Sequence, residues 1–185
     1  MRRVVVLGGP GSGKSTVARA LGERIGAPVI HLDRLFFDPG WTPRPKAAFL
    51  ADVEAAHAGE AWVSEGNYGA TWPVRFARTD TLVFLDVVTP LRLWRVLRRI
   101  AGGYGRVRAD MAPGCPEQLD LAFLRFVVEW RGERRRAGLA AVREARPGLD
   151  AHVLRTRPDV AAFLAAVPGS PGAARDVRPT PRLAR

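Results

Sequence analysis

The sequence has little cysteine and little lysine, and it has no long apolar run. Its one cysteine, Cys115, can form no disulfide within the chain and offers no thiolate cluster to zinc. No apolar stretch approaches the roughly 18–20 uncharged residues that cross a bilayer, and residues 4–7 are too few for the apolar centre of a signal peptide. We therefore expect a cytoplasmic protein with no membrane partner.

The basic residues are almost all arginine. Only Lys14 and Lys46 are lysines among 29 basic residues, and 18 acidic residues leave a formal net charge of +11. This excess creates a positive field that attracts nucleotides, sugar phosphates and other polyanions, and it leaves nucleic acid open as a second kind of partner. The 47% hydrophobic and 25% charged residues of this 185-residue chain are typical of a folded domain rather than a disordered one.

Short apolar strands alternate with amphipathic helices along the chain, which predicts a parallel sheet flanked by helices. The expected strands are residues 3–7, 29–32, 61–64, 81–85 and 151–154. The expected helices are residues 14–25, 45–57, 90–101, 119–136 and 139–145, and a last helix that follows a capping arrangement at Thr156 and Asp159. The sequence therefore predicts one α/β domain over residues 1–167 with a five-stranded parallel sheet.

Two segments fall outside this alternation. Residues 99–116 contain a glycine-rich stretch without periodicity, which predicts a small mobile lid. Residues 168–185 hold prolines, glycines and arginines with almost nothing apolar to bury, which predicts a disordered tail. The oligomeric state is not predicted.

A phosphate-binding loop is the strongest signal in the sequence. The segment GGPGSGKST matches the Walker A pattern between an expected strand and an expected helix. Its backbone N–H groups and the positive end of the helix dipole are predicted to bind the phosphates of ATP. Lys14 would neutralise phosphate charge, and the Ser15 hydroxyl would ligate Mg²⁺. The predicted nucleotide-binding residues are Gly8, Gly9, Pro10, Gly11, Ser12, Gly13, Lys14, Ser15 and Thr16.

Two carboxylates follow expected strands, and parallel strands bring their carboxyl ends to one edge of the sheet. Asp86 follows TLVFL and is a candidate to hold a magnesium-bound water, with capping of the next turn as the alternative. Asp33 follows VIHL and is a candidate to take a proton from an acceptor hydroxyl or to orient magnesium, with a solvated loop residue as the alternative.

Arginines and polar residues beyond the loop complete the predicted site. Phosphoryl transfer depends on positioning and charge neutralisation, so Arg98 and Arg99 at the start of the lid are candidate catalytic residues. Each could instead be a solvated surface arginine. Asn67, Tyr68 and Arg75 follow the third expected strand and are candidates to bind the acceptor together with Asp33.

These motifs together resemble the adenylate-kinase-like P-loop family of DNA topology modulation proteins (FlaR-type) and, more distantly, nucleoside monophosphate kinases and shikimate-type kinases. The motifs that carry the resemblance are GGPGSGKST, HLDRLFFDPGW, EGNYGATWPVR, RTDTLVFLD, LRLWRVLRR and RADMAPGCPEQLD. The resemblance implies the P-loop NTPase fold with a small lid, ATP as a ligand, and Arg98 and Arg99 where the lid begins. It departs from adenylate kinase at Glu65-Gly66-Asn67-Tyr68, where that enzyme has an acidic-Gly-Phe-Pro-Arg segment.

The sequence thus predicts a magnesium- and ATP-dependent kinase, a transferase that moves the γ-phosphoryl group to a small acceptor. A nucleotide, a nucleoside or another hydroxyl metabolite could serve as that acceptor. The alternative is a nucleotide-dependent protein that associates with DNA or regulates another molecule.

Overall fold

The computed structural model describes residues 1–169, and its centre is a five-stranded parallel sheet. The strands are β1 (Arg3–Gly8), β2 (Val29–His31), β5 (Trp62–Glu65), β6 (Thr81–Leu85) and β7 (Asp150–Leu154). They lie in the order β2-β5-β1-β6-β7, and every pairing is parallel. The α/β prediction is confirmed. Because β1 has a parallel neighbour on each side, the loop that follows it opens at the middle of the carboxyl edge.

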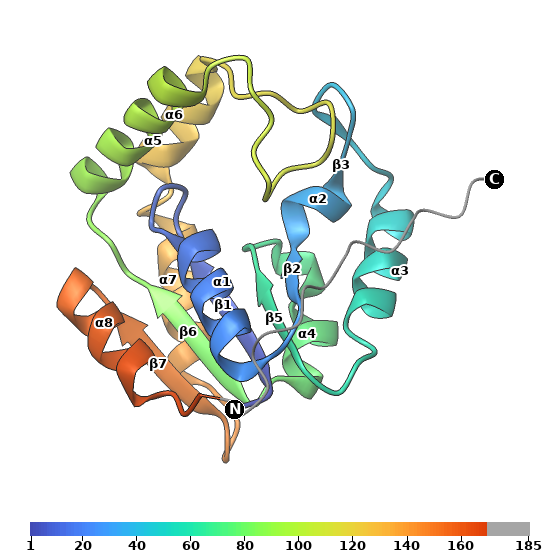
Figure 1. Ribbon diagram of the computed structural model, residues 1–185, viewed down its shortest axis with the longest axis vertical. Coiled ribbons are helices and arrows are strands. Elements are labelled where there is room, and N and C mark those ends of the chain that lie inside the picture. Colours follow the sequence, from blue (N-terminus) through green and yellow to red (C-terminus); the bar gives the residue numbers. More distant parts are fainter. Residues whose placement is uncertain (170–185) are drawn as a thin grey trace.

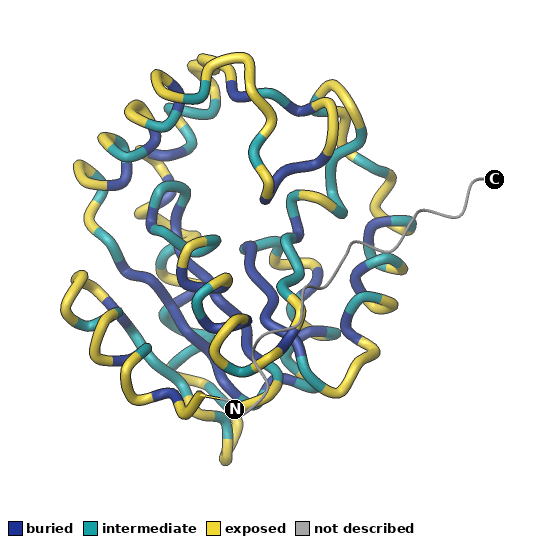
Figure 2. Tube along the Cα trace, viewed as in Figure 1, coloured by how far each residue is buried: buried dark blue, intermediate teal, exposed yellow. Residues whose placement is uncertain are grey.

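Four helices cover the two faces of the sheet (Figure 1). Alternate residues of β1 separate the two cores: Val4 and Val6 pack with helices α1 (Lys14–Ile25) and α8 (Arg157–Ala166), whereas Val5 and Leu7 face helices α4 (Trp72–Arg78) and α7 (Glu133–Arg143). Figure 2 shows the strands as the buried centre of the molecule. Burial on both faces explains why the strands are continuous apolar runs.

Two further groups of elements lie on opposite sides of the carboxyl edge of the sheet (Figure 1). One group consists of α2 (Leu32–Phe36), the hairpin strands β3 (Phe37–Asp38) and β4 (Thr42–Pro43), and α3 (Lys46–Ala56). The other is the helix pair α5 (Thr89–Gly103) and α6 (Leu121–Glu129), which packs through Val96, Ile100 and Val127. Residues 104–120 join these two helices, and we call them the lid loop.

The lid loop packs against the β3–β4 hairpin, and together they cover the carboxyl edge of the sheet. The amide of Gly40 donates to the carbonyl of Gly114 at 2.8 Å, and Trp41 Nε1 donates to the carbonyl of Pro116 at 3.0 Å. Met111, Ala112 and Cys115 form an apolar cluster with Phe37 and Trp41. Trp41 adopts a positive φ of 61°, which is strained for a bulky residue, and such strain gathers at functional sites.

Most expected elements appear with small shifts at their ends. Helix α5 continues to Gly103, so Arg98 and Arg99 lie on the helix and the irregular segment begins after them. The segment expected as one helix over 119–136 is interrupted at Gly132, between α6 and α7. The capping box of Thr156 and Asp159 is present. Helix α2, the hairpin, the 3₁₀ helix η1 (Gly69–Thr71) and helix α4 were not expected.

The predicted tail over 168–185 falls almost entirely on residues 170–185, which lie outside the described part of the chain. Within residues 1–169, no helix is long and apolar enough to span a bilayer.

The close packing of Gly138 against Phe84 predicts how alanine at this position changes the stability of the protein. A Cβ atom at Gly138 in α7 would lie 2.3 Å from Cε2 of the fully buried Phe84, whereas one at Gly102 in α5 would meet nothing within 4 Å. Alanine gains about 1 kcal/mol over glycine in a helix, but overpacking a core costs about 1–3 kcal/mol. Urea denaturation should therefore find Gly138→Ala destabilised by about 1–2 kcal/mol and Gly102→Ala slightly stabilised. Equal stabilisation of both variants would contradict the packing.

Candidate active site

The backbone between Gly8 and Lys14 is shaped to bind phosphate. Gly8, Gly11 and Gly13 have φ angles of 147°, 75° and 98°, values that L side chains rarely adopt. Helix α1 begins directly after them, so its positive dipole end and first N–H groups face the loop. Pro10 to Thr16 all line one cavity. The loop therefore has the geometry that the Walker A motif predicts.

Two arginines of α5, which the sequence analysis did not select, hold the carbonyl groups of this loop. Arg92 Nη1 donates to the carbonyl of Pro10 at 3.3 Å, and Arg95 Nη1 donates to the carbonyl of Ser12 at 3.2 Å. Arg92 is almost fully buried. A Cβ at Gly9 would lie 2.5 Å from Arg92 Nη1, and one at Gly11 would lie 2.4 Å from the Arg92 carbonyl. The absence of a side chain at Gly9 and Gly11 therefore allows α5 to approach the loop this closely.

Asn67 fixes the start of the loop. Its Oδ1 accepts from the amide of Gly8 at 3.1 Å, and its Nδ2 donates to the carbonyl of Gly8 at 2.8 Å. Trp72 Nε1 donates to the carbonyl of Asn67 at 2.6 Å and holds that residue in place. Asn67 was expected to bind the acceptor, and it lines the cavity, but both polar atoms of its side-chain amide bond the backbone of Gly8. It therefore positions the phosphate loop.

A carboxylate that the sequence analysis did not select meets Ser15. The hydroxyl of Ser15 donates to Glu65 Oε1 at 3.1 Å, and His31 Nδ1 lies 2.9 Å from the same oxygen, so His31 carries its proton on Nδ1 there. Burial would raise the pKa of Glu65, but the His31 hydrogen bond and the Lys14 charge outweigh it and lower that pKa. Glu65 ends the buried strand beside β1, and that position is the signal that could have selected it.

Lys14 faces two acids across the cavity. Its Nζ donates to the carbonyl of Gly9 at 3.3 Å, within the loop itself. Burial lowers the pKa of its ammonium group, while the negative charges of Glu65 and Asp33 oppose that change. A lysine that bonds a loop carbonyl can exchange it for phosphate oxygens without leaving the loop.

These oxygen donors fit Mg²⁺. Mg²⁺ usually takes one or two carboxylates, several waters and substrate phosphates rather than a complete protein cage. Ser15 and Glu65 present such oxygen donors. Burial raises the pKa of the nearby Asp110, but the charge of Arg108 and, after it, the hydrogen bond from Ser15 lower that pKa overall. Residues 1–169 contain no group of three or more acidic, histidine or cysteine side chains that could hold a metal by themselves. Both findings suit an ion shared with a nucleotide.

Asp33 lies in the first turn of α2 and lines the cavity. The Tyr68 hydroxyl donates to Asp33 Oδ1 at 2.5 Å. Burial and then the charge of Glu65 raise the pKa of Asp33, whereas the Tyr68 hydrogen bond and the Lys14 charge lower it. Tyr68 has a strained φ of 24° and packs its ring against Phe36 and Phe49. The structure thus brings Asp33 and Tyr68 together as one pair.

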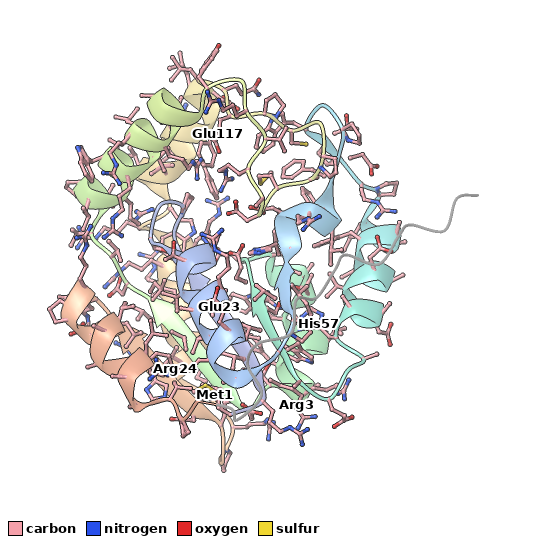
Figure 3. The ribbon with its side chains drawn as sticks, in the orientation of Figure 1. Met1, Arg3, Glu23, Arg24, His57 and Glu117 are labelled. Carbon is pink, nitrogen blue, oxygen red and sulfur yellow. The ribbon has the colours of Figure 1, made fainter. Side chains whose placement is uncertain are left out.

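Arg98 and Arg99, which precede the lid loop, both line the cavity, but they have different partners. Arg99 Nε lies 3.1 Å from Glu117 Oε1, and Arg108 pairs with the same oxygen and, at 2.8 Å, with Asp110. Glu117 is buried near the top of the molecule, at the opposite end from Met1 and Arg3 (Figure 3). Arg98 instead stacks its guanidinium over the Trp94 ring at 4.9 Å. Arg99 therefore anchors the lid loop, while Arg98 stays at the cavity rim.

Gly8 and Gly9 do not line the cavity, and outside the phosphate loop two predicted site residues do not reach it. Arg75 is completely buried and donates to the carbonyl of Gly66 at 2.9 Å, so it supports the β5 loop from below rather than reading an acceptor. Burial lowers the pKa of Arg75 to about 9. Both carboxylate oxygens of Asp86 accept from Arg135, at 2.6 and 2.7 Å, so the expectation that Asp86 holds a magnesium-bound water is replaced by an ion pair with α7.

The phosphate loop, the Asp33–Tyr68 pair and the two arginines Arg98 and Arg99 line one cavity of about 1430 Å³. Its walls come from the phosphate loop, α2, the β5–α4 segment, α5, α6 and the lid loop. Ligand cavities usually measure about 300–1,000 Å³, so this one has room for a nucleotide and a second substrate together. The predicted residues that line it outside the phosphate loop are Asp33, Asn67, Tyr68, Arg98 and Arg99.

Solved structures of small-molecule kinases share this fold. A sugar kinase from Janibacter sp. matches with a TM-score of 0.52 at 16% identity, over 95% of this chain and 99% of that one. A shikimate kinase from Bacteroides thetaiotaomicron matches with 0.51 at 16% identity, over 89% and 94% of the two chains. A gluconokinase from Sinorhizobium meliloti matches with 0.50 at 19% identity, over 89% and 91%. The chain therefore has the fold of P-loop kinases.

The sequence comparisons give no closer relationship. No protein family profile matches the sequence, and no curated protein sequence matches it significantly. The resemblance to FlaR-type proteins stays a prediction, while the likeness to P-loop kinases rests on the structures.

The Asp86–Arg135 pair makes a prediction that separates a structural role from a magnesium role. Arg135 lowers the pKa of Asp86 below its usual value of 3.8. This stabilisation is present above the unfolded pKa and is lost as the pH falls through the folded one. Asp86→Asn should therefore lose about 1–3 kcal/mol at pH 7, and the difference from the original protein should shrink below about pH 4.

Urea denaturation at several pH values measures this difference. Glu129→Gln, which removes an exposed pair with Arg125, serves as the control and should change stability by less than about 0.5 kcal/mol. An Asp86→Asn protein of unchanged stability that lost magnesium-dependent nucleotide binding would restore the role expected from the sequence.

Proposed function

We propose that this protein is an ATP- and magnesium-dependent kinase that transfers the γ-phosphoryl group of ATP to the hydroxyl of a small acceptor. One observation carries the proposal: the phosphate loop and its lysine open into the same cavity as the half-buried carboxylate of Asp33, which has no cationic partner at ion-pair distance in the described residues. The kinase fold of the structural neighbours supports it.

The bound nucleotide would lie along the phosphate loop. The N–H groups between Gly8 and Ser15 and the Lys14 ammonium would surround the β- and γ-phosphates. The base would lie near Trp94 and Arg98 of α5 and near Arg155 and Arg157, which precede and begin α8, because these four residues also line the cavity. Bound Mg²⁺ would be held by Ser15, with Glu65 at its side, and would offset phosphate charge.

The transfer step needs a base for the acceptor proton. The acceptor oxygen attacks the γ-phosphorus, the bond from that phosphorus to the β–γ bridging oxygen breaks, and ADP leaves with the electron pair. Asp33 receives the acceptor proton on the carboxylate oxygen that Tyr68 does not occupy. Lys14 compensates the negative charge that develops on the transferring and leaving oxygens. The lid loop, which packs against the β3–β4 hairpin, would exclude water from the γ-phosphate.

The net charge of +11 favours a second candidate, a nucleotide-dependent protein associated with DNA or a regulator. DNA affinity that survives physiological salt and changes with MgATP would support it, because bulk charge alone produces binding that salt removes.

The two lysines of the chain provide a matched test of the proposed kinase. Lys14→Ala should lower phosphoryl transfer about 10²–10³-fold, whereas Lys46→Ala, which changes an exposed residue at the start of α3, should leave the rate unchanged. The measurement is acceptor-dependent ADP release with MgATP and a panel of nucleotides, nucleosides and sugars. Calorimetry with a nonhydrolysable nucleotide measures binding separately. ATP consumption that no acceptor accelerates, or wild-type transfer by Lys14→Ala, would contradict the proposal.

The pair of Tyr68 and Asp33 predicts a pH effect. Asp33 must be ionised to accept a proton, so the rate falls as the pH drops through its pKa. The Tyr68 hydrogen bond lowers that pKa, and Tyr68→Phe removes the hydroxyl while keeping the ring. The acidic limb of the rate profile should therefore move to higher pH in Tyr68→Phe. Tyr104→Phe, on the exposed part of the lid loop, should not move it. An unshifted profile in Tyr68→Phe would separate Asp33 from proton transfer.

A further inference from the structure

The charged side chains that line the cavity differ in sign between the chain segments that contribute them. Among the described residues, eight cations from the phosphate loop, α1, α5, α7 and the segment that leads into α8 line the cavity: Lys14, Arg19, Arg95, Arg98, Arg99, Arg134, Arg155 and Arg157. We call this the donor half, because the Walker A loop lies in it. The acceptor half is formed by cavity residues of the segments 33–69 and 104–120. It holds five acids, Asp33, Glu65, Asp110, Glu117 and Asp120, and only one cation, Arg108.

That single cation is not free to bind an anion. Arg108 pairs with both Glu117 and Asp110, and Glu117 also engages Arg99. Arg75, which the sequence suggested as an acceptor-binding residue, is completely buried and donates to the carbonyl of Gly66. Glu65 and Asp110 lie beside Ser15, at the boundary with the donor half. Asp33 and Asp120 have no cation at ion-pair distance among the described residues, so the acceptor half keeps an excess of negative charge.

Partly buried aromatic rings form the other component of the acceptor half. Phe36, Phe37, Trp41 and Tyr68 all line the cavity. Their ring centroids lie 4.8 Å apart for Phe36 and Phe37, 4.8 Å for Phe36 and Tyr68, and 5.3 Å for Phe37 and Trp41. Rings that pack together and still reach a cavity offer flat apolar surface to a ligand.

We infer that the acceptor is uncharged or cationic and has a flat apolar or aromatic face near its hydroxyl, as a nucleoside has. The inference rests on the proposed kinase function. Acceptors that carry a carboxylate or phosphate beside the hydroxyl are disfavoured, because the described residues offer no unpaired cation in the acceptor half to compensate them. Two charges about 6 Å apart at an effective dielectric constant near 20 change an equilibrium constant about 100-fold.

Matched acceptor pairs test the charge rule. The probes are adenosine against adenosine monophosphate, methyl shikimate against shikimate, and glucosamine against gluconate. Calorimetry measures the binding of each probe to the full chain loaded with Mg²⁺ and a nonhydrolysable ATP analogue, and radiolabelled ATP measures transfer. The first member of each pair should bind at least about tenfold more tightly, and adenosine should bind best of the six.

Tighter binding of the anionic members, or no binding of any first member to the loaded protein, would overturn the inference and leave the kinase proposal in place. A chain that does not take up the ATP analogue at all would instead overturn the proposed function. The two failures are therefore distinguished by the first titration of the same experiment.

A charge placed in the acceptor half tests the location. Gln118 is exposed and lines the cavity, whereas its neighbour Leu119 is 58% exposed and does not line it. Gln118→Lys should improve the binding of the anionic probes about tenfold relative to their partners, and Leu119→Lys should not. An equal improvement in both variants would show that the overall field, and not the acceptor half, sets the preference.

Trp41 tests the aromatic surface. Trp41→Leu should raise KM for adenosine about tenfold and should leave KM for ATP unchanged. Trp41→Phe keeps a ring but loses the hydrogen bond to Pro116, so it controls for the attachment of the lid loop and should bind adenosine nearly normally. A KM for adenosine that rises equally in both variants would assign Trp41 to the lid contact alone.

Discussion

The site depends on one constraint, which is that the phosphate loop must turn its N–H groups inward. A loop of this kind leaves its carbonyl groups on the outside, where each one needs a donor. Arg92 and Arg95 supply donors from α5, and Asn67 supplies one from the β5 loop. These contacts connect the loop to elements far away in the sequence. Glycines at positions 9 and 11 are needed for the same reason, because α5 approaches too closely for any side chain.

The same contacts connect the loop with the lid loop. Helix α5 carries Arg92 and Arg95 near its start and Arg99 near its end, and Arg99 pairs with Glu117 of the lid loop. Glu117 also pairs with Arg108, which reaches Asp110 beside Ser15. A continuous chain of charged contacts therefore joins the phosphate loop to the lid loop. Because these groups are partly buried, salt screens them only weakly.

The sequence was sufficient for features that depend on neighbouring residues. The strands, the Walker A loop and the capping box at Thr156 follow from local patterns, and Asp33 could be selected because it follows a strand. Features that depend on distant partners could not be predicted. Asp86 follows a strand as Asp33 does, yet Arg135 of α7 occupies it. Glu65, Arg92 and Arg95 had no motif of their own, since what distinguishes them is the partner that the fold brings to each.

A kinase cavity must hold two substrates with different electrostatic needs. The nucleotide is strongly anionic and binds more tightly as cations accumulate, whereas a carboxylate base such as Asp33 would lose its basicity if those cations surrounded it. In this cavity, burial and then the charge of Glu65 keep the pKa of Asp33 raised, while Lys14 stays close enough to reach bound phosphates. If Asp33 is the base, as we propose, the acidic residues that keep its pKa raised would also repel anionic acceptors, so the requirement for a base and the choice of acceptor would follow from the same arrangement of charges.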